Sequence, residues 1–306
     1  MSKDELIKAG GQAVIEGVMI RSNHHIAIAV RKENGKIALK KERLNSLMDK
    51  FKLLKLPFLR GIIYLIEMMI TGFKALNFSA QEALDDGDEE EKGELSTMEL
   101  VITFVFAIGF AVLLFKFLPL LVAEFFQSNS VTVSKNYWLF NLIDGLVRIL
   151  VFVLYIWILS FMKDIKRIFQ YHGAEHQAVH CYEAKLPLTV KNVQKFNPEH
   201  PRCGTSFILI VLILSVFVYT FIPGTLGFWG KLGFRLALLP VIAGVSYEVL
   251  KLVGKFHSKN GFFRVIVWPG MLTQKITTSK PEDDMVEVAI LALKTVVKME
   301  KKSSKS

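Results

Sequence analysis

The sequence has little cysteine and no recognisable export signal. Only two of its 306 residues are cysteines, Cys181 and Cys203, and no C-x-x-C pair is present. We interpret both as reduced thiols or metal ligands rather than as a disulfide. The N-terminus, MSKDELIKAGGQ, lacks the basic stretch followed by an apolar stretch that marks a cleaved secretory signal. We therefore expect no such signal, and we find no internal repeat.

The chain contains several long runs with few charged residues, and these runs indicate which class of protein it is. Hydrophobic residues make up 52% of the chain, and its mean hydropathy is +0.38. Several apolar runs reach about 20 residues, which is the length that crosses a hydrocarbon core ~30 Å thick. We predict an α-helical polytopic membrane protein with about four transmembrane helices. A small cytoplasmic β unit at the N-terminus makes it α+β overall.

The positions of lysine and arginine predict how the chain crosses the membrane. The expected spans are residues 98–122, 138–162, 207–222 and 232–253. Lys and Arg number fifteen in residues 1–97, seven in the segment between the second and third spans, and ten from Lys255 onward. The other two loops hold one each. The positive-inside rule then places both termini and the middle segment in the cytoplasm, in a multi-pass plasma-membrane protein.

The net charge of +10 raises the question of nucleic acid as a partner. Most of the basic residues lie outside the apolar runs, where attraction to anionic lipid headgroups accounts for them. We therefore expect an anionic lipid bilayer as the partner and no nucleic acid. A homo-oligomer, or a membrane or cytoplasmic protein partner, stays open.

Four segments follow from this organisation. Residues 1–45 are the β unit, residues 46–97 an interfacial or re-entrant helix with an acidic linker, residues 98–254 the membrane domain with a metal-motif loop at 163–205, and residues 255–306 a cytoplasmic tail.

Within the first and last of these segments, finer predictions are possible. Strands are expected over residues 12–21, 26–31 and 36–43, with Asn34-Gly35 forming a type I′ hairpin turn. In the tail we expect a strand or loop at 262–268, a break at Pro269-Gly270, and an amphipathic helix over 281–298.

The candidate chemistry is concentrated in the polar segment from Tyr171 to Ser206. His172, Glu175 and His176 form an H-x-x-E-H pattern. On a helix, two histidines four residues apart share a face and can bind one metal ion. Glu175 is then placed to act as general base toward a water activated by that metal. Zinc or another divalent transition metal is the expected cofactor.

Further residues in or near this segment could complete the site. Glu248, near the cytoplasmic end of the fourth span, is the leading candidate for the third ligand, although it could instead pair with Lys251 or Arg148. Glu183, His200 and Cys203 are also capable of binding a metal, and His180 continues the helical stripe. Within the second span, Asp144 and Arg148 are expected to form a structural pair.

Five motifs, taken together and in this order, are similar to those of a known family. They are GGQAVIEGVMIR at 10–21, YHGAEHQAVHCYE at 171–183, HPRCGTSF at 200–207, SYEVLKL at 246–252 and WPG…LTQKITT at 268–278. Over nearly its whole length the chain resembles the bacterial YqhQ family. That family is a domain of unknown function described as metal-dependent membrane enzymes, so the resemblance implies membrane placement and metal chemistry. Carried over by motif, it points to Gln12, Glu16, His172, Glu175, His176, Glu183, His200, Cys203 and Glu248.

Three hypotheses follow for function. The first is a metal-dependent hydrolase at the cytoplasmic face of the membrane, with a substrate that the sequence does not identify. The second is a non-enzymatic scaffold or transporter-like protein, whose structural metal site would be closed by His200 and Cys203. The third is a metal or redox sensor that uses Cys181 and Cys203.

Overall fold

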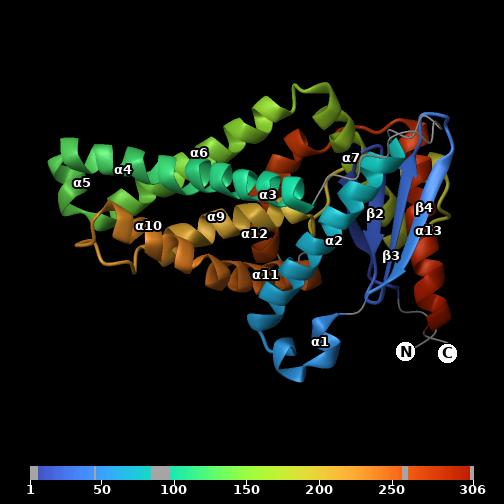
Figure 1. The fold of residues 1–306 in the computed structure, drawn as a ribbon, viewed down its shortest axis with the longest axis horizontal. Helices are drawn as coiled ribbons and strands as arrows, with labels where there is room; N and C mark the ends of the chain where they lie inside the picture. The colour runs from blue at the N-terminus through green and yellow to red at the C-terminus, as the bar shows by residue number, and fades with distance from the viewer. Residues whose placement is uncertain (1–5, 45, 84–96, 257–260, 304–306) are drawn as a thin grey trace.

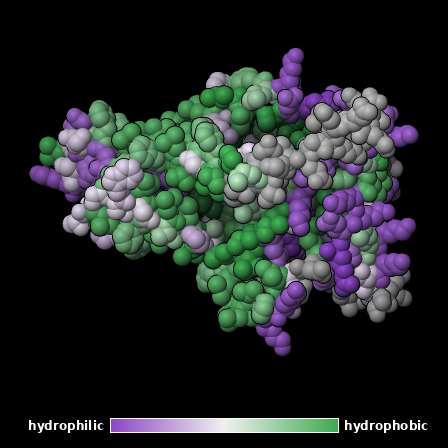
Figure 2. All heavy atoms as spheres, in the orientation of Figure 1, coloured by the Kyte–Doolittle hydropathy of each residue, from purple (hydrophilic) through white to green (hydrophobic). Residues whose placement is uncertain are grey.

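The computed structural model describes residues 6–44, 46–83, 97–256 and 261–303. The molecule is elongated, with a bundle of helices at one end and a small sheet flanked by helices at the other (Figure 1). The surface follows the same division, since apolar residues cover the bundle and hydrophilic residues gather around the sheet (Figure 2). The acidic run of the expected linker lies mostly outside the described residues.

The sheet is a four-stranded antiparallel meander in the order β1-β2-β3-β4. Its strands are β1 (Gly10–Val14), β2 (Gly17–Arg21), β3 (His25–Arg31) and β4 (Ile37–Arg43). Three strands were expected here. That prediction is wrong because the segment expected as the first strand, residues 12–21, forms parts of two strands, β1 and β2. A tight turn at Ile15-Glu16 joins β1 to β2, with Glu16 at a φ of 49°.

The hairpin between β3 and β4 falls where the sequence places it, but its turn type differs. Gly35 has a φ of +79°, whereas Asn34 is not among the residues with positive φ. A type I′ turn requires positive φ at both central residues, so that part of the prediction is wrong. The loop is closed by the N–H of Gly35 on the Lys32 carbonyl and by the N–H of Lys32 on the Lys36 carbonyl, each at 2.9 Å.

Helices cover both faces of the sheet. On one face, α7 (Lys163–Glu183) and α13 (Asp283–Ser303) pack against Val18 and Ile20. On the other, α2 (Leu59–Ala83) packs against Met19 and Ile28. Because both faces are buried, β2 is apolar at four of its five positions rather than alternating with polar residues. The helix expected over residues 281–298 is confirmed as α13.

Glu300, in the last turns of α13, ties this helix to the start of β3. Its carboxylate bonds to Nδ1 of His24 at 2.7 Å, to Nδ1 of His25 at 2.8 Å and to the hydroxyl of Ser22 at 2.7 Å. Burial alone would raise the pKa of Glu300, but the hydrogen bonds from His25, His24 and Ser22 outweigh it and lower that pKa to about 2.

We expect Glu300→Gln to destabilise the sheet end of the molecule in a pH-dependent way. A depressed carboxyl pKa contributes stability above the unfolded value of ~4.3, and this contribution disappears as the pH falls toward 2. Near pH 7 the loss should be about 1–3 kcal/mol, as for hydrogen bonds to a charged group. Thermal unfolding in detergent across this pH range measures it. Glu287→Gln, on the exposed side of α13, is the matched control, and equal effects of the two variants would contradict the prediction.

The bundle contains fewer clear membrane spans than expected. Two stretches are long and apolar enough to cross a membrane, Val105–Asn129 and Tyr137–Leu159. The first comprises the second half of α3 (Thr97–Val112), a π-helical turn (Leu113–Phe117) and α4 (Leu118–Asn129), and the second is α6. A third is present if α10 (Phe228–Ala237) and α11 (Leu239–Phe256), bent by 43°, count as one. Among the described residues, two to three helices could therefore span, rather than clearly four.

The remaining apolar run forms α9 (Gly204–Tyr219), which falls short of a full-length span. Its 16 residues extend ~24 Å at a rise of 1.5 Å per residue. The polar loop expected at 123–137 is also mostly helical, because α4 continues to Asn129 and α5 (Val131–Lys135) follows.

The pairing of Asp144 with Arg148 is confirmed, and a second arginine joins it. Both side chains are buried, and the Asp144 carboxylate accepts from Arg148 and, at 2.5 Å, from Arg235 of α10. Arg148 also donates to the hydroxyl of Ser215 in α9 at 2.6 Å. Asp144 and its two arginines therefore link three helices of the bundle, α6, α9 and α10.

The helix α2 connects the bundle to the sheet, and two further helices lie near it in the chain or in the bundle. Ahead of α2, the chain forms α1 (Leu47–Lys50) and a 3₁₀ turn (Lys52–Lys55), and α2 itself runs from the sheet to α11. The tail forms α12 (Gly261–Thr277), so the strand or loop at 262–268 and the break at Pro269 are wrong. The helix continues through Pro269 because α12 packs closely against α9. A Cβ on Gly270 would come within 2.6 Å of the Ser206 hydroxyl oxygen.

Candidate metal site

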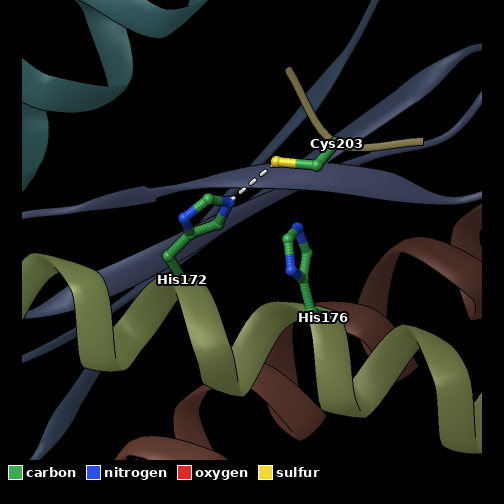
Figure 3. A group of neighbouring side chains, drawn as sticks. All are labelled: His172, His176 and Cys203. Carbon is green, nitrogen blue, oxygen red and sulfur yellow. Dashed lines mark hydrogen bonds between the residues drawn. The ribbon is translucent and has the colours of Figure 1, made fainter. Parts of the chain in front are cut away.

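His172 and His176 lie side by side on α7, where the helix passes between the sheet and the bundle. Their ring centroids are 4.3 Å apart, as expected for residues one turn apart on a helix. Both rings point from the same face of α7 toward Cys203 (Figure 3). His176 is buried and His172 is partly buried. The shared face predicted by the H-x-x-E-H pattern is confirmed.

Backbone carbonyl groups fix the tautomers of both rings. Nδ1 of His172 lies 2.8 Å from the Thr277 carbonyl oxygen, and Nδ1 of His176 lies 2.5 Å from that of Pro198. A carbonyl can only accept, so each Nδ1 carries the hydrogen and donates it. Each Nε2 then keeps a free lone pair. This is the outer-shell arrangement that orients histidine ligands in metal sites.

Cys203 approaches these lone pairs from the N-terminus of α9. Its Sγ lies 3.2 Å from Nε2 of His172 and accepts the N–H of Thr205 at 3.4 Å, which caps the helix. One ligand atom from each of His172, His176 and Cys203 lies within 4.8 Å of the others. Two imidazole nitrogens and a thiol sulfur are donors that suit zinc, so this group fits a transition-metal ion.

A cavity of about 60 Å³ adjoins the group, in the described part of the chain. It has room for several waters, since one water needs ~10–15 Å³ on this measure. Polar and catalytically capable residues form much of its wall. The lining residues are Ala9, Gly10, Gly11, Glu175, His176, Val179, His200, Arg202, Cys203 and Gly204.

Glu175 faces this cavity from α7. Its carboxylate lies 3.5 Å from Nε2 of His176 and receives a hydrogen bond from the backbone of Gly11 in β1. Burial raises the pKa of Glu175, and burial lowers the pKa of His176. The N-terminal sheet therefore reaches the site, which the sequence did not reveal.

A second group of metal-capable side chains lies next to the first. His180, Glu183 and His200 offer atoms within 4.8 Å of one another, and the ring of His200 is 5.6 Å from that of His176. Burial, and then the neighbouring His200, lower the pKa of His180 to about 4. Arg202 pairs with Glu183, however, and brings a positive charge that disfavours a cation at this group.

Three residues singled out from the sequence lie elsewhere. Glu248 bonds to Arg60 of α2, at 2.7 Å from its Nε, and belongs to neither metal-capable group. Glu16 forms a two-point pair with Arg167 at the start of α7. Gln12 packs on α2, where a Cβ at Gly72 would lie 2.7 Å from its amide nitrogen.

Cys181 is also separate from the site. It is a free, buried cysteine in the core that α7 and α13 form with the sheet. Its sulfur lies 3.7 Å from the Pro187 carbonyl oxygen. A sensor that pairs Cys181 with Cys203 would need these two thiols to leave different environments.

Sequence reasoning missed the residue that holds the loop from His200 to Cys203 in place. The side chain of Gln274, in α12, accepts the N–H of His200 at 2.7 Å and donates to the His200 carbonyl at 3.0 Å and to Ser206 at 2.9 Å. It is completely buried. Its only signal in the sequence is a glutamine within the apolar, threonine-rich stretch LTQKITT.

The fold and the site define a class: a largely helical protein with two to three helices able to cross a membrane, a small antiparallel sheet, and a His–His–Cys group where the two meet. The chain belongs to the family described as "Protein of unknown function (DUF1385)", whose model matches residues 56–299. It is 37% identical over 316 residues to the Bacillus subtilis (strain 168) protein named "Uncharacterized protein YqhQ", covering 98% of this chain and 96% of that relative. The resemblance noted from the motifs is therefore confirmed. No solved structure matches the chain.

Proposed function

We propose that the protein is a metal-dependent hydrolase that works at the cytoplasmic face of the membrane. The ligands would be His172, His176 and Cys203, and zinc is the expected ion. The observation that carries this proposal is the set of three donor atoms within 4.8 Å, with both histidine Nδ1 atoms engaged by backbone carbonyls. Glu248, bonded to Arg60, has no part in it.

The surroundings of the three ligands favour a catalytic site over a closed structural one. Catalytic zinc has three protein ligands and an open position, whereas structural zinc has four. His200, the fourth ligand that a structural site would need, does not join the His172, His176 and Cys203 group. When bound there, the metal would supply Lewis acidity and lower the pKa of a water at the open position.

Glu175 would act as the general base. Its carboxylate faces the cavity beside His176, and the Gly11 backbone holds it in place. A base must lie within hydrogen-bond reach of the proton that it removes, or reach it through one water. The Glu175 carboxylate lies 3.5 Å from Nε2 of His176 and lines the same cavity, which places it to reach a water bound there.

For the membrane, we propose four spans with both termini in the cytoplasm. The spans would be the helix over 105–129, α6, α9, and the bent pair α10 and α11. The distribution of basic residues supports this orientation, since the two loops on the opposite side, residues 130–136 and 220–227, hold only Lys135. The short α9 packs among α6, α11 and α12, and protein rather than lipid then surrounds much of it. The metal site would lie just inside the cytoplasmic surface, and anionic lipid headgroups would contact the basic segments.

We expect Glu175→Gln to keep the metal and lose the reaction. Detergent-purified protein would be screened against chromogenic phosphate esters, carboxylic esters and peptides, with metal content measured on each sample. For any substrate that the wild type hydrolyses, the variant should be slower by about 10²–10⁴-fold, which is the usual contribution of a general base. Glu199→Gln, in the loop that follows α8 (Val190–Val193), is the matched control. A Glu175→Gln variant as active as the wild type would exclude this role.

A further inference from the structure

His200 carries a hydrogen-bond donor that has no acceptor. Its Nδ1 accepts the N–H of Arg202 at 3.2 Å, so the neutral ring has its hydrogen on Nε2. Nε2 is buried and has no hydrogen-bond partner, and its nearest carboxylate oxygen, on Glu183, is 3.6 Å away. The side chain is only 5% exposed and lines the cavity. A buried donor of this kind is destabilising unless an acceptor lies next to it.

The neighbouring walls of the cavity also present donors. Arg202 lines the cavity with a charged side chain. Gly204, the first residue of α9, also lines the cavity, so the positive end of the helix dipole lies beside the same space. No heavy atom lies within 4 Å of the position where a Cβ on Gly204 would be. The wall formed by His200, Arg202 and the start of α9 therefore presents positive or hydrogen-donating groups beside an open space.

We propose that this wall binds the phosphate group of the substrate, next to the metal. The inference rests on the proposed hydrolase, for which it names the substrate class. A ligand that binds against His200 and Arg202 must offer acceptors to them, and a negative charge matches Arg202 and the helix N-terminus. A phosphate has enough oxygens to meet three donors from three directions and still present one to the metal. A carboxylate has only two.

The location of the wall fits a phosphate at the membrane surface. Arg202 reaches toward the end of α11, where a Cβ on Gly254 would lie 3.0 Å from its Cδ. Both α9 and α11 are apolar helices of the bundle, so their ends near Arg202 lie at the level of lipid headgroups in the proposed topology. The phosphate could come from a lipid headgroup or from a free phosphate compound, and the site chemistry is the same for both.

The test measures phosphate binding to the full-length protein in detergent by isothermal titration calorimetry. The metal content is measured on the same sample. One arm uses inorganic phosphate, and the other uses short-chain phosphatidic acid in neutral detergent micelles. We expect Arg202→Gln to weaken binding at least tenfold while the metal content stays constant. Lys191→Gln, which removes an exposed positive charge on α8, should bind like the wild type.

Arg202 also pairs with Glu183, so its replacement could disturb the fold. Glu183→Gln addresses this, since it removes the competing anion and should leave phosphate binding as tight or tighter. Tighter binding of phosphatidic acid than of inorganic phosphate would indicate that the phosphate comes from a lipid headgroup. Equal affinity in both arms would indicate a free phosphate compound.

The possible failures can be told apart. Metal without phosphate binding in either arm, or binding that Arg202→Gln leaves unchanged, overturns the inference alone. Phosphate binding that depends on Arg202 in a protein without metal keeps the phosphate site and rejects the hydrolase.

Discussion

Replacing His176 by alanine is expected to remove the metal from the protein. His176 offers one of only three donor atoms in the group, and it is buried, so water cannot easily take its place. Loss of one of three ligands should reduce the affinity by well over the 10–100-fold that is typical of an outer-shell change. Inductively coupled plasma mass spectrometry on purified protein would show near-stoichiometric zinc in the wild type and almost none in the variant.

The most informative comparison is with Cys203→Ser and Glu248→Gln. The Cys203 variant should lose zinc as the His176 variant does, because it removes the sulfur beside Nε2 of His172. Glu248→Gln should keep its zinc and instead lose stability, because it weakens the two-point bond with Arg60. If Glu248→Gln lost zinc while Cys203→Ser kept it, the ligand set proposed here would be wrong. A folded wild type without metal would remove the basis for a hydrolase.

The pairing of His172 with His176 was predictable because their relation is local. A spacing of four residues on a helix places two side chains on one face whatever the rest of the chain does. The third member of the metal-capable group could not be chosen in the same way. Glu248 and Cys203 were both candidates, and the choice depends on which helices meet at α7. The loop held by Gln274 brings Cys203 to the histidines, while α2 brings Arg60 to Glu248.

For the fold as well, local features could be predicted from the sequence, but contacts between distant segments could not. Apolar runs located the apolar helices of the bundle, but composition could not show that α9 ends after 16 residues or that the last pair is bent. The β unit was recognised from its strands and from Asn34-Gly35. Its contact with Glu175 was hidden because Gly11 contributes backbone rather than a side chain. Packing of α12 on α9 likewise kept Pro269 inside a helix that the proline rule would have ended.

The largest expected effect on stability comes from Asp144. Its carboxylate is the partner of both Arg148 and Arg235, and all three side chains are at most 1% exposed. Asp144→Ala would leave two buried guanidinium groups without their anion, which typically destabilises a protein by about 3–5 kcal/mol. Thermal unfolding in detergent should show a large drop in midpoint. Asp164→Asn, on the exposed start of α7, should change it little.

A triple variant separates the cost of unpaired charge from the loss of packing. Replacing Asp144 by leucine together with Arg148 and Arg235 by methionine removes all three charges at similar volume. Such replacements of buried ion groups are often neutral or stabilising by about 1–4 kcal/mol, so the triple variant should recover most of the stability that Asp144→Ala loses. Recovery would mean that the triad is costly to break but is not the source of stability in the bundle. If the triple variant were as unstable as the single one, the hydrogen bond from Arg148 to Ser215 and the packing of both arginines on Tyr219 would carry the stability instead.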